Sequence, residues 1–229
     1  MANIVLIHGA YQGGWIWRDT ARALRLKGHD VYTPTLEGCA ERAHQLRVGI
    51  TTEAHADELA ELLRCYDLDA VTIVGTSTGG MSACKLAEVA RARIAKVVLV
   101  DALALDDGER LSDIVRRPHA VTTELATGPT REDAAGRLFA ELEAPVRDWA
   151  LERYTFHPLD VMQEPVRLSS FWDSTWDAAV IWCRHSPNPP LAHQQRAAER
   201  LKARWHELDT GHYPMLQAPT KLAELIANG

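Results

Sequence analysis

Short apolar runs alternate with amphipathic stretches along most of this chain. The runs rich in β-branched side chains are predicted to be buried strands, and they cover residues 4–7, 30–33, 71–74, 96–100 and 178–183. Stretches with apolar side chains at helical spacing are predicted to be helices, at residues 15–26, 52–63, 81–92 and from 220 onward. A last, more polar strand is expected over residues 204–208. Because strands that alternate with helices are typical of parallel βαβ crossovers, the pattern predicts a mostly parallel sheet with helices on both faces.

The alternation breaks between residues 103 and 173. This stretch is charged, is dotted with aromatic side chains, and has a pattern that favours helices. It lies between two predicted strands, so we expect it to be an insertion over the carboxyl edge of the sheet, where such sheets bind ligands. The sequence therefore predicts an α/β core of residues 1–102 and 174–229 with a helical cap, or lid, of residues 103–173, in one compact domain overall.

Composition narrows the class of protein. The 229 residues are 46% hydrophobic, enough for a full core, and their formal net charge of −6 argues against a nucleic-acid-binding protein. The four cysteines form no Cys-x-x-Cys pair, which favours free thiols in a reducing cytoplasm over a disulfide framework or a zinc site. Neither a basic leader nor a long apolar segment begins the sequence, so we expect a cytoplasmic protein without a membrane span.

The motif Gly75-x-Ser77-x-Gly79 lies between a predicted strand and a predicted helix. A strand that turns at once into a helix strains its corner residue, and glycines on either side remove the Cβ atoms that would collide there. The serine hydroxyl then projects from the sheet edge as a candidate nucleophile. The N–H of Thr78 lies at the helix N-terminus, directed at developing negative charge. The alternative is a glycine-rich turn whose serine only caps the helix.

Ala10 follows the first predicted strand, where a hydrolase of this architecture supplies its second oxyanion N–H, and it is the candidate donor. A dinucleotide-binding turn is the alternative at this place. It is disfavoured because Gly9, Gly13 and Gly14 miss the G-x-G-x-x-G spacing, and because no acidic residue ends the second strand. The sequence contains neither a phosphate-binding Gly-Lys-Ser/Thr motif nor His-Glu-x-x-His, so we expect no cofactor and no metal.

His212 is the candidate general base among ten histidines. It follows the last predicted strand, and a short loop there can reach back over the sheet edge to Ser77. A neutral imidazole within hydrogen-bond reach of the serine takes its proton and returns it to the leaving group.

These residues resemble the α/β-hydrolase superfamily, in particular the branch of methyl-salicylate-type esterases, hydroxynitrile lyases and their bacterial relatives. The resemblance covers nearly the whole chain and is strongest in residues 5–10, 14–17, 28–35, 75–80 and 208–212. It implies the α/β-hydrolase fold, a nucleophile at Ser77, a base at His212, oxyanion donors at Ala10 and Thr78, and no cofactor.

The sequence offers more than one candidate for the acidic member of the expected catalytic triad. The family's acid follows the strand matched here by residues 180–183, where this chain has Ser186, and a hydroxyl cannot offset the charge of an imidazolium. Asp101 ends the strand after the nucleophile helix, a position at which some α/β-hydrolases carry their acid. The alternative is that Asp101 caps the following turn. Asp106 and Asp107 are weaker candidates in the same loop.

We therefore predict a serine hydrolase that cleaves a small carboxylic ester, or a related amide, lactone or thioester, through an acyl-enzyme. Side chains of the cap are candidate walls of its substrate pocket: Trp149, Tyr154, Phe156, His157 and Trp172. A non-catalytic small-molecule binder is one alternative, suggested by Ser186. A hydroxynitrile-lyase-like carbon–carbon lyase is another, disfavoured because those relatives carry a threonine where this chain has Gly9. The expected partner is a small ester-like molecule rather than nucleic acid or membrane, and a homodimer is left open.

Overall fold

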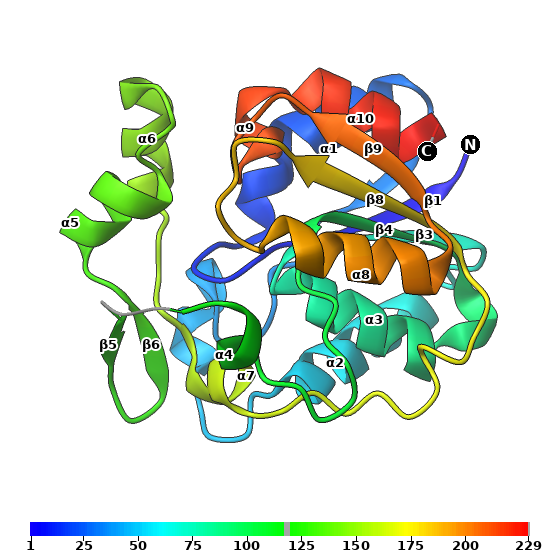
Figure 1. Cartoon of the computed structure of the whole chain (residues 1–229), viewed down its shortest axis with the longest axis horizontal. Coiled ribbons are helices and arrows are strands. Elements are labelled where there is room, and N and C mark those ends of the chain that lie inside the picture. The colour runs from blue at the N-terminus through cyan, green and yellow to red at the C-terminus, as the bar shows by residue number, and fades with distance from the viewer. Residues whose placement is uncertain (117–119, 229) are drawn as a thin grey trace.

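The computed structural model describes residues 1–116 and 120–228, so residues 117–119 of the predicted cap lie outside the described part. A parallel sheet with the strand order β2-β1-β3-β4-β8-β9 runs through the molecule (Figure 1). Its strands are β1 (Asn3–Ile7), β2 (Asp30–Tyr32), β3 (Val71–Ser77), β4 (Ile94–Ala102), β8 (Asp177–Cys183) and β9 (Arg204–Leu208). The predicted sheet is confirmed, and β3 extends three residues beyond the predicted strand, up to Ser77 itself.

Helices cover both faces of this sheet. They are α1 (Arg18–Leu26), α2 (Thr52–Cys65), α3 (Gly79–Val89), α8 (Leu191–Leu201), α9 (Pro214–Gln217) and α10 (Pro219–Asn228), with the shorter 3₁₀ turns η1 (Gly14–Trp17), η2 (Ala40–Gln45) and η3 (Arg91–Arg93). In Figure 1, α1 and α10 lie above the sheet, while α2, α3 and α8 lie below it. The sequence pattern did not predict α8.

Alternate side chains of each central strand enter two separate cores. Along β1, Val5 and Ile7 pack with side chains of α2, α3 and α8, whereas Ile4 and Leu6 pack with those of α1 and α10. This follows from the two-residue period of a strand, and it explains why strands buried on both faces show an almost unbroken apolar sequence.

Residues 103–176, here called the intervening segment, connect β4 to β8. Its helical turns are α4 (Leu111–Ile114), α5 (Arg131–Asp133), the π-helical η4 (Ala134–Leu138), α6 (Ala144–Leu151) and α7 (Leu159–Gln163). An antiparallel sheet of β5 (Ala120–Thr122), β6 (Ala126–Pro129) and β7 (His157–Pro158) accompanies them. The purely helical prediction is thus wrong in part, because the threonine-rich residues 120–129 fold back as a hairpin.

In Figure 1, α5, α6, β5 and β6 of the intervening segment lie to one side of the parallel sheet, on the side toward which the arrow of β8 points, and the yellow residues after α7 run along the bottom of the view to reach β8. All four cysteines are free thiols, as the sequence predicts. Within the described residues, no helix combines the length and the apolar character needed to cross a membrane.

Candidate active site

Ser77 occupies a strained corner between β3 and α3. Its backbone φ angle is +50°, in the left-handed region that residues other than glycine rarely adopt. A Cβ on Gly75 would lie 2.6 Å from the carbonyl oxygen of Gly79, and a Cβ on Gly79 would lie 2.4 Å from that of His8. The turn therefore tolerates no side chain at either glycine, and the strained corner that the motif predicts is confirmed.

The backbone around β1 closes onto the same corner. A Cβ on Gly9 would lie 2.7 Å from the Cβ of Ser77, so the loop after β1 packs directly on the serine. Ala10 and Thr78 line one cavity together with Ser77. Thr78 is the N-cap of α3, where backbone N–H groups have no partner within the helix and the helix dipole favours negative charge.

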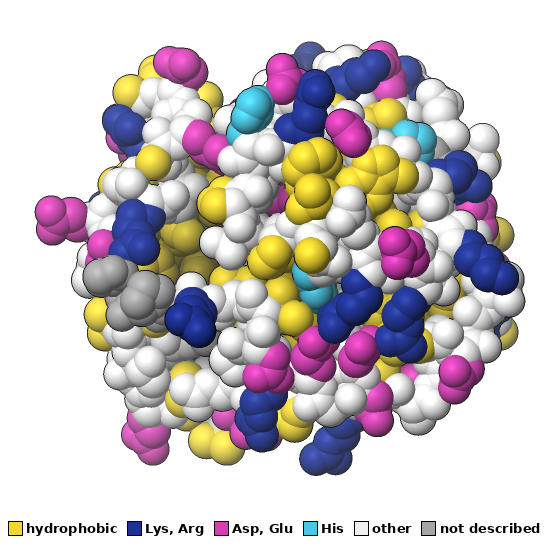
Figure 2. Space-filling model, viewed as in Figure 1, with side chains coloured by type: hydrophobic (Ala, Val, Ile, Leu, Met, Phe, Trp, Pro, Cys, Tyr) yellow, Lys and Arg dark blue, Asp and Glu magenta, His cyan; other side chains and the backbone are white. Residues whose placement is uncertain are grey.

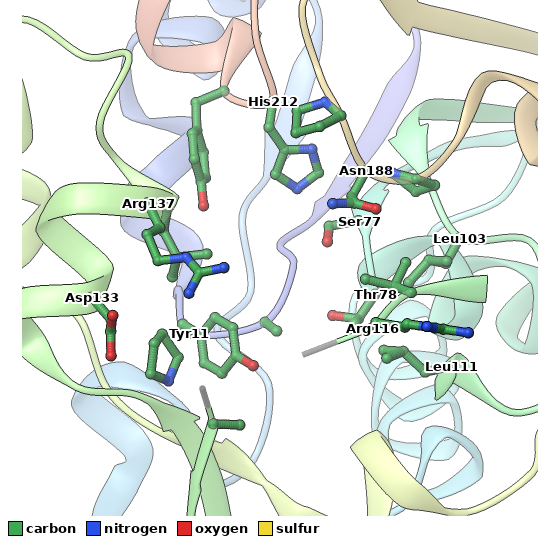
Figure 3. A pocket seen from close by; sticks show the side chains of 18 of the residues that line it. Tyr11, Ser77, Thr78, Leu103, Leu111, Arg116, Asp133, Arg137, Asn188 and His212 are labelled. Carbon is green, nitrogen blue, oxygen red and sulfur yellow. The ribbon is translucent and has the colours of Figure 1, made fainter. Parts of the chain in front are cut away.

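His212 reaches this cavity from the loop after β9, and its ring is held from behind by Asp101. The distance from His212 Nδ1 to Asp101 Oδ2 is 2.5 Å. Because a carboxylate accepts but does not donate, the proton lies on Nδ1, which leaves Nε2 as the acceptor. Ser77 and His212 both project into the cavity (Figure 3).

The carboxylate of Asp101 is fully buried and has a partner at each oxygen. Its Oδ2 accepts from His212, and its Oδ1 accepts from Nε2 of Gln194 on α8 at 2.6 Å. The Gln194 amide also donates to the carbonyl of Pro189 at 3.2 Å, so it is held in place from two sides. The sequence pattern did not single out Gln194 because it did not predict α8, although Ala197 and Leu201 are apolar and four residues apart.

The other acid candidates lie elsewhere. Ser186 Oγ lies 3.4 Å from His212 Nδ1, farther than Asp101, and donates to the carbonyl of Asn188 at 2.9 Å. Asp106 pairs with Arg200 on α8. Asp107 accepts from the N–H of Leu168 at 2.8 Å. Among the acidic candidates from the sequence, the structure thus brings only Asp101 to the histidine.

His8, next to the nucleophile corner, serves a different purpose from His212. Burial lowers the pKa of His8 to about 4, so its ring is neutral near pH 7. Its Nε2 accepts from the N–H of Leu36 at 3.0 Å, and its Nδ1 lies 2.8 Å from the carbonyl of Gly9. Both ring nitrogens are therefore occupied in holding two loops together.

A cavity of about 470 Å³ opens in front of Ser77 and His212. Its walls combine loops at the sheet edge with the intervening segment, which contributes Leu111, Val115, Leu138 and Met162 among its apolar residues. In Figure 2, hydrophobic side chains lie in a hollow between the intervening segment, at the left, and the rest of the molecule. The volume suits a small organic molecule.

The five predicted pocket walls do not line this cavity. Trp149 packs edge-on against Trp15 at 5.1 Å between ring centres. Tyr154 donates from its hydroxyl to the carbonyl of Pro129 at 2.5 Å. Phe156 packs edge-on against Tyr154. Trp149 thus attaches the intervening segment to η1, whereas the contacts of Tyr154 with Pro129 and of Phe156 with Tyr154 lie within the segment.

The remaining two predicted walls are corrected in the same way. His157 is buried, and its Nδ1 lies 3.4 Å from Sγ of Cys39. Trp172 donates from Nε1 to the carbonyl of Leu105 at 3.0 Å and is covered by Arg200. Aromatic residues in a sequence predict burial, but they do not predict which side of a segment faces a cavity. The aliphatic residues that line this cavity have no pattern in the sequence that distinguishes them from other buried residues.

Glu141 connects the intervening segment to the histidine loop. Its carboxylate accepts hydrogen bonds from the backbone N–H groups of His212 and Tyr213, while loss of solvent raises its pKa above the usual range. A Cβ on Gly211 would lie 1.5 Å from Glu141 Oε2, so a side chain at that position would displace the Glu141 carboxylate.

Comparisons with known proteins identify the family of this chain. Residues 4–225 match the profile of the Alpha/beta hydrolase family. This chain belongs to that family. It is 30% identical to a carbendazim hydrolyzing esterase from Nocardioides sp. (strain SG-4G), with 99% of each chain covered. It is 29% identical to an alpha-hydroxynitrile lyase from Arabidopsis thaliana over 45% of this chain and 41% of that protein.

Solved structures show the same fold for this α/β-hydrolase. An extracellular alpha/beta-hydrolase from a Paenibacillus species superposes with a TM-score of 0.84 at 20% identity, covering 99% of this chain and 98% of the other. Methylesterases of Arabidopsis thaliana are also among the relatives that the chain matches. The family resemblance and the prediction of an α/β-hydrolase-type esterase are thereby confirmed.

Proposed function

We propose that this α/β-hydrolase cleaves a small carboxylic ester, or a related amide, lactone or thioester, through an acyl-enzyme on Ser77. The observation that carries the proposal is the His212–Asp101 hydrogen bond of 2.5 Å behind a histidine that shares a cavity with a strained serine. A serine hydroxyl is a weak nucleophile until a neighbouring base removes its proton. The strained corner and the paired histidine both support such activation.

The proposed reaction runs in two halves. His212 Nε2 takes the proton of Ser77 as Oγ attacks the acyl carbon, and the N–H groups of Ala10 and Thr78 hold the oxyanion. The imidazolium then protonates the departing alcohol, which leaves the acyl group on Ser77. Water attacks this acyl-enzyme with His212 again as base, and the acid departs as the serine regains its proton.

Asp101 is the proposed acid of this triad. Its negative charge stabilises the imidazolium at each proton transfer, and its hydrogen bond keeps the proton on Nδ1 so that Nε2 stays available. Ser186 offers the same nitrogen only a neutral hydroxyl at 3.4 Å. Ser186 at the family's acid position suggested a non-catalytic binding protein. The carboxylate of Asp101 beside His212 removes that reason.

We also propose that residues 103–173 act as the cap that the sequence suggested. Side chains from this stretch form one wall of the cavity, which supports a role in excluding water and orienting a substrate. The lyase alternative is disfavoured at Gly9, because a side chain there would lie against Ser77.

Replacement of the nucleophile tests the proposal. We expect Ser77→Ala to lower kcat on p-nitrophenyl butyrate by about 10⁶-fold, with an unchanged circular dichroism spectrum. Ser169→Ala, at an exposed serine of the intervening segment, is the matched control and should retain full activity. Wild-type protein should react with a fluorophosphonate at Ser77. Retained turnover in Ser77→Ala, or failure of the probe to label Ser77, would refute the acyl-enzyme.

A further inference from the structure

The cavity in front of Ser77 is not purely apolar. Among the aliphatic side chains on its wall, the intervening segment also places Asp133, Arg137 and Glu141, each four residues after the one before. Figure 3 shows the Arg137 side chain reaching across the cavity in the direction of Ser77. A guanidinium in such a place affects which substrates can fill the cavity.

The two acidic groups of this row are already engaged by the protein. Asp133 forms a side-chain hydrogen bond with Thr130 at 3.1 Å. Glu141 accepts from the N–H groups of His212 and Tyr213. Neither carboxylate lies within 4.0 Å of the Arg137 guanidinium, so neither forms an ion pair with it.

Arg137 has no hydrogen-bond or ion-pair partner among residues 1–116 and 120–228. It lies in η4, a π-helical turn that directly follows the three residues of α5. Turns of this kind are rare in proteins and frequent at functional sites. The wider turn presents a cationic side chain toward the cavity without giving it a counter-ion.

An unpaired guanidinium selects against neutral apolar ligands. A substrate that fills the cavity displaces water from Arg137, and that loss is unfavourable unless the substrate brings an acceptor. A carboxylate is the acceptor that best fits the planar guanidinium, because it takes two parallel hydrogen bonds. Arg116 also lines the cavity and lies across from Arg137 in Figure 3; both arginines are exposed at the cavity, so the test below includes a variant at each.

We propose that Arg137 binds a carboxylate on the substrate, so that the preferred substrates are monoesters of dicarboxylic acids. The ester carbonyl lies at Ser77 and the free carboxylate lies at Arg137, at the other end of the cavity. This inference rests on the proposed esterase function and adds to it the chemical class of the acyl group.

Pairs of esters that differ only in a terminal group test the inference. Monomethyl succinate, glutarate and adipate are compared with methyl butanoate, pentanoate and hexanoate, in which a methyl group replaces the carboxylate. Hydrolysis is followed in a pH-stat. We expect wild-type protein to prefer the acidic member of at least one pair, with an optimum in chain length that matches the distance from Ser77 to Arg137.

Arg137→Met should lower the ratio of kcat/KM for the acidic ester to that for its neutral match by about tenfold to a hundredfold, mainly through KM. Arg137→Lys should restore part of the ratio, because it keeps the charge and loses the two-point geometry. Arg147→Met is the matched control: it removes the same charge from α6, outside the described cavity lining, and should leave the ratio unchanged.

A binding measurement separates this inference from the proposed function. Calorimetric titration of the Ser77→Ala protein with monomethyl glutarate requires no turnover, and affinity should fall about tenfold or more when Arg137→Met is added. Suppose that wild-type protein hydrolyses the neutral esters, but that Arg137→Met changes neither the ratio of kcat/KM values nor the affinity for monomethyl glutarate. The inference about Arg137 is then wrong, and the proposed esterase function is unaffected. If the preference instead follows Arg116→Met, the assignment to Arg137 is wrong. If no ester is hydrolysed, the titration alone decides.

Discussion

Two loops of this hydrolase face the same nitrogen of His212, and they differ in what they offer it. The C-terminal end of β4 presents Asp101, a buried carboxylate at 2.5 Å. The loop after β8 presents Ser186, a hydroxyl at 3.4 Å in a more exposed stretch. Both strands end at the same edge of a parallel sheet, so either loop can approach the histidine. The shorter distance to Nδ1, rather than the strand that carries the side chain, is what supports Asp101 over Ser186 as the proposed acid.

The surroundings of the two loops explain why the first is the better place for a charge. Asp101 has φ +44°, which turns its side chain at the end of β4, and the neighbouring N–H of Leu103 donates to the carbonyl of Ser77 at 2.9 Å. Gln194 supplies the remaining hydrogen bond. A buried carboxylate is tolerated only when such partners are present. Ser186 instead donates its proton to the carbonyl of Asn188, an arrangement that suits a hydroxyl.

Of the two side chains that face Nδ1, Asp101 at the end of β4 is expected to have the larger effect on the rate. Asp101→Asn keeps the size of the side chain, and asparagine tolerates the positive φ, so we expect the fold to persist. The amide cannot stabilise an imidazolium and favours the wrong ring tautomer. The kcat for p-nitrophenyl butyrate should therefore fall by about 10⁴-fold.

The matched control for this variant is Asp107→Asn, in the same connection but bonded to Leu168. It should keep kcat within about twofold, while thermal unfolding monitors both proteins. A rate unaffected by Asp101→Asn would mean that Asp101 only caps its turn, and the triad acid would then have to be sought elsewhere.

Much of this site was predictable because its geometry is local. The corner at Ser77 needs glycine at Gly75 and Gly79 for steric reasons, and the alternation of strands and helices gives the sheet edge to which His212 belongs. The choice between Asp101 and Ser186 was not predictable in the same way. It depends on how closely two loops from different strands approach one ring, and on Gln194 in a helix that sequence reasoning missed.

The intervening segment was the least predictable region. Its aromatic residues suggested a pocket, yet Trp149 and Trp172 attach it to neighbouring elements, and aliphatic side chains such as Leu138 and Met162 line the cavity. Which face of a short helix points inward is decided by the packing of the whole segment. Arg137 had no sequence signal either, because a single arginine in a polar helix is normally solvated.

Moving the carboxylate from position 101 to position 186 is expected to change kcat by a smaller factor. In the Asp101→Asn background, Ser186→Asp places a carboxylate on the side chain that already lies 3.4 Å from Nδ1. We expect it to raise kcat by about tenfold to a hundredfold over the single variant, the size of a hydrogen bond to a charged group. Recovery should be incomplete, because the carbonyl of Asn188 lies next to the new charge.

Ser186→Asn in the same background is the control, since it has nearly the same shape without the charge. Equal kcat values for the Ser186→Asp and Ser186→Asn proteins would show that a carboxylate in the loop after β8 cannot replace Asp101 at His212 Nδ1.

The smallest expected effect is at Gln194, which positions Asp101 without touching substrate. Gln194→Leu removes the donor to Asp101 Oδ1 and leaves one carboxylate oxygen buried without a partner. We expect kcat to fall about tenfold with KM nearly unchanged, because the loss is felt when the imidazolium forms rather than when substrate binds. Gln195→Leu changes the exposed neighbour on α8 and should match wild type. A fall confined to KM, or an equal fall in both variants, would show that Gln194 supports the helix and not the acid.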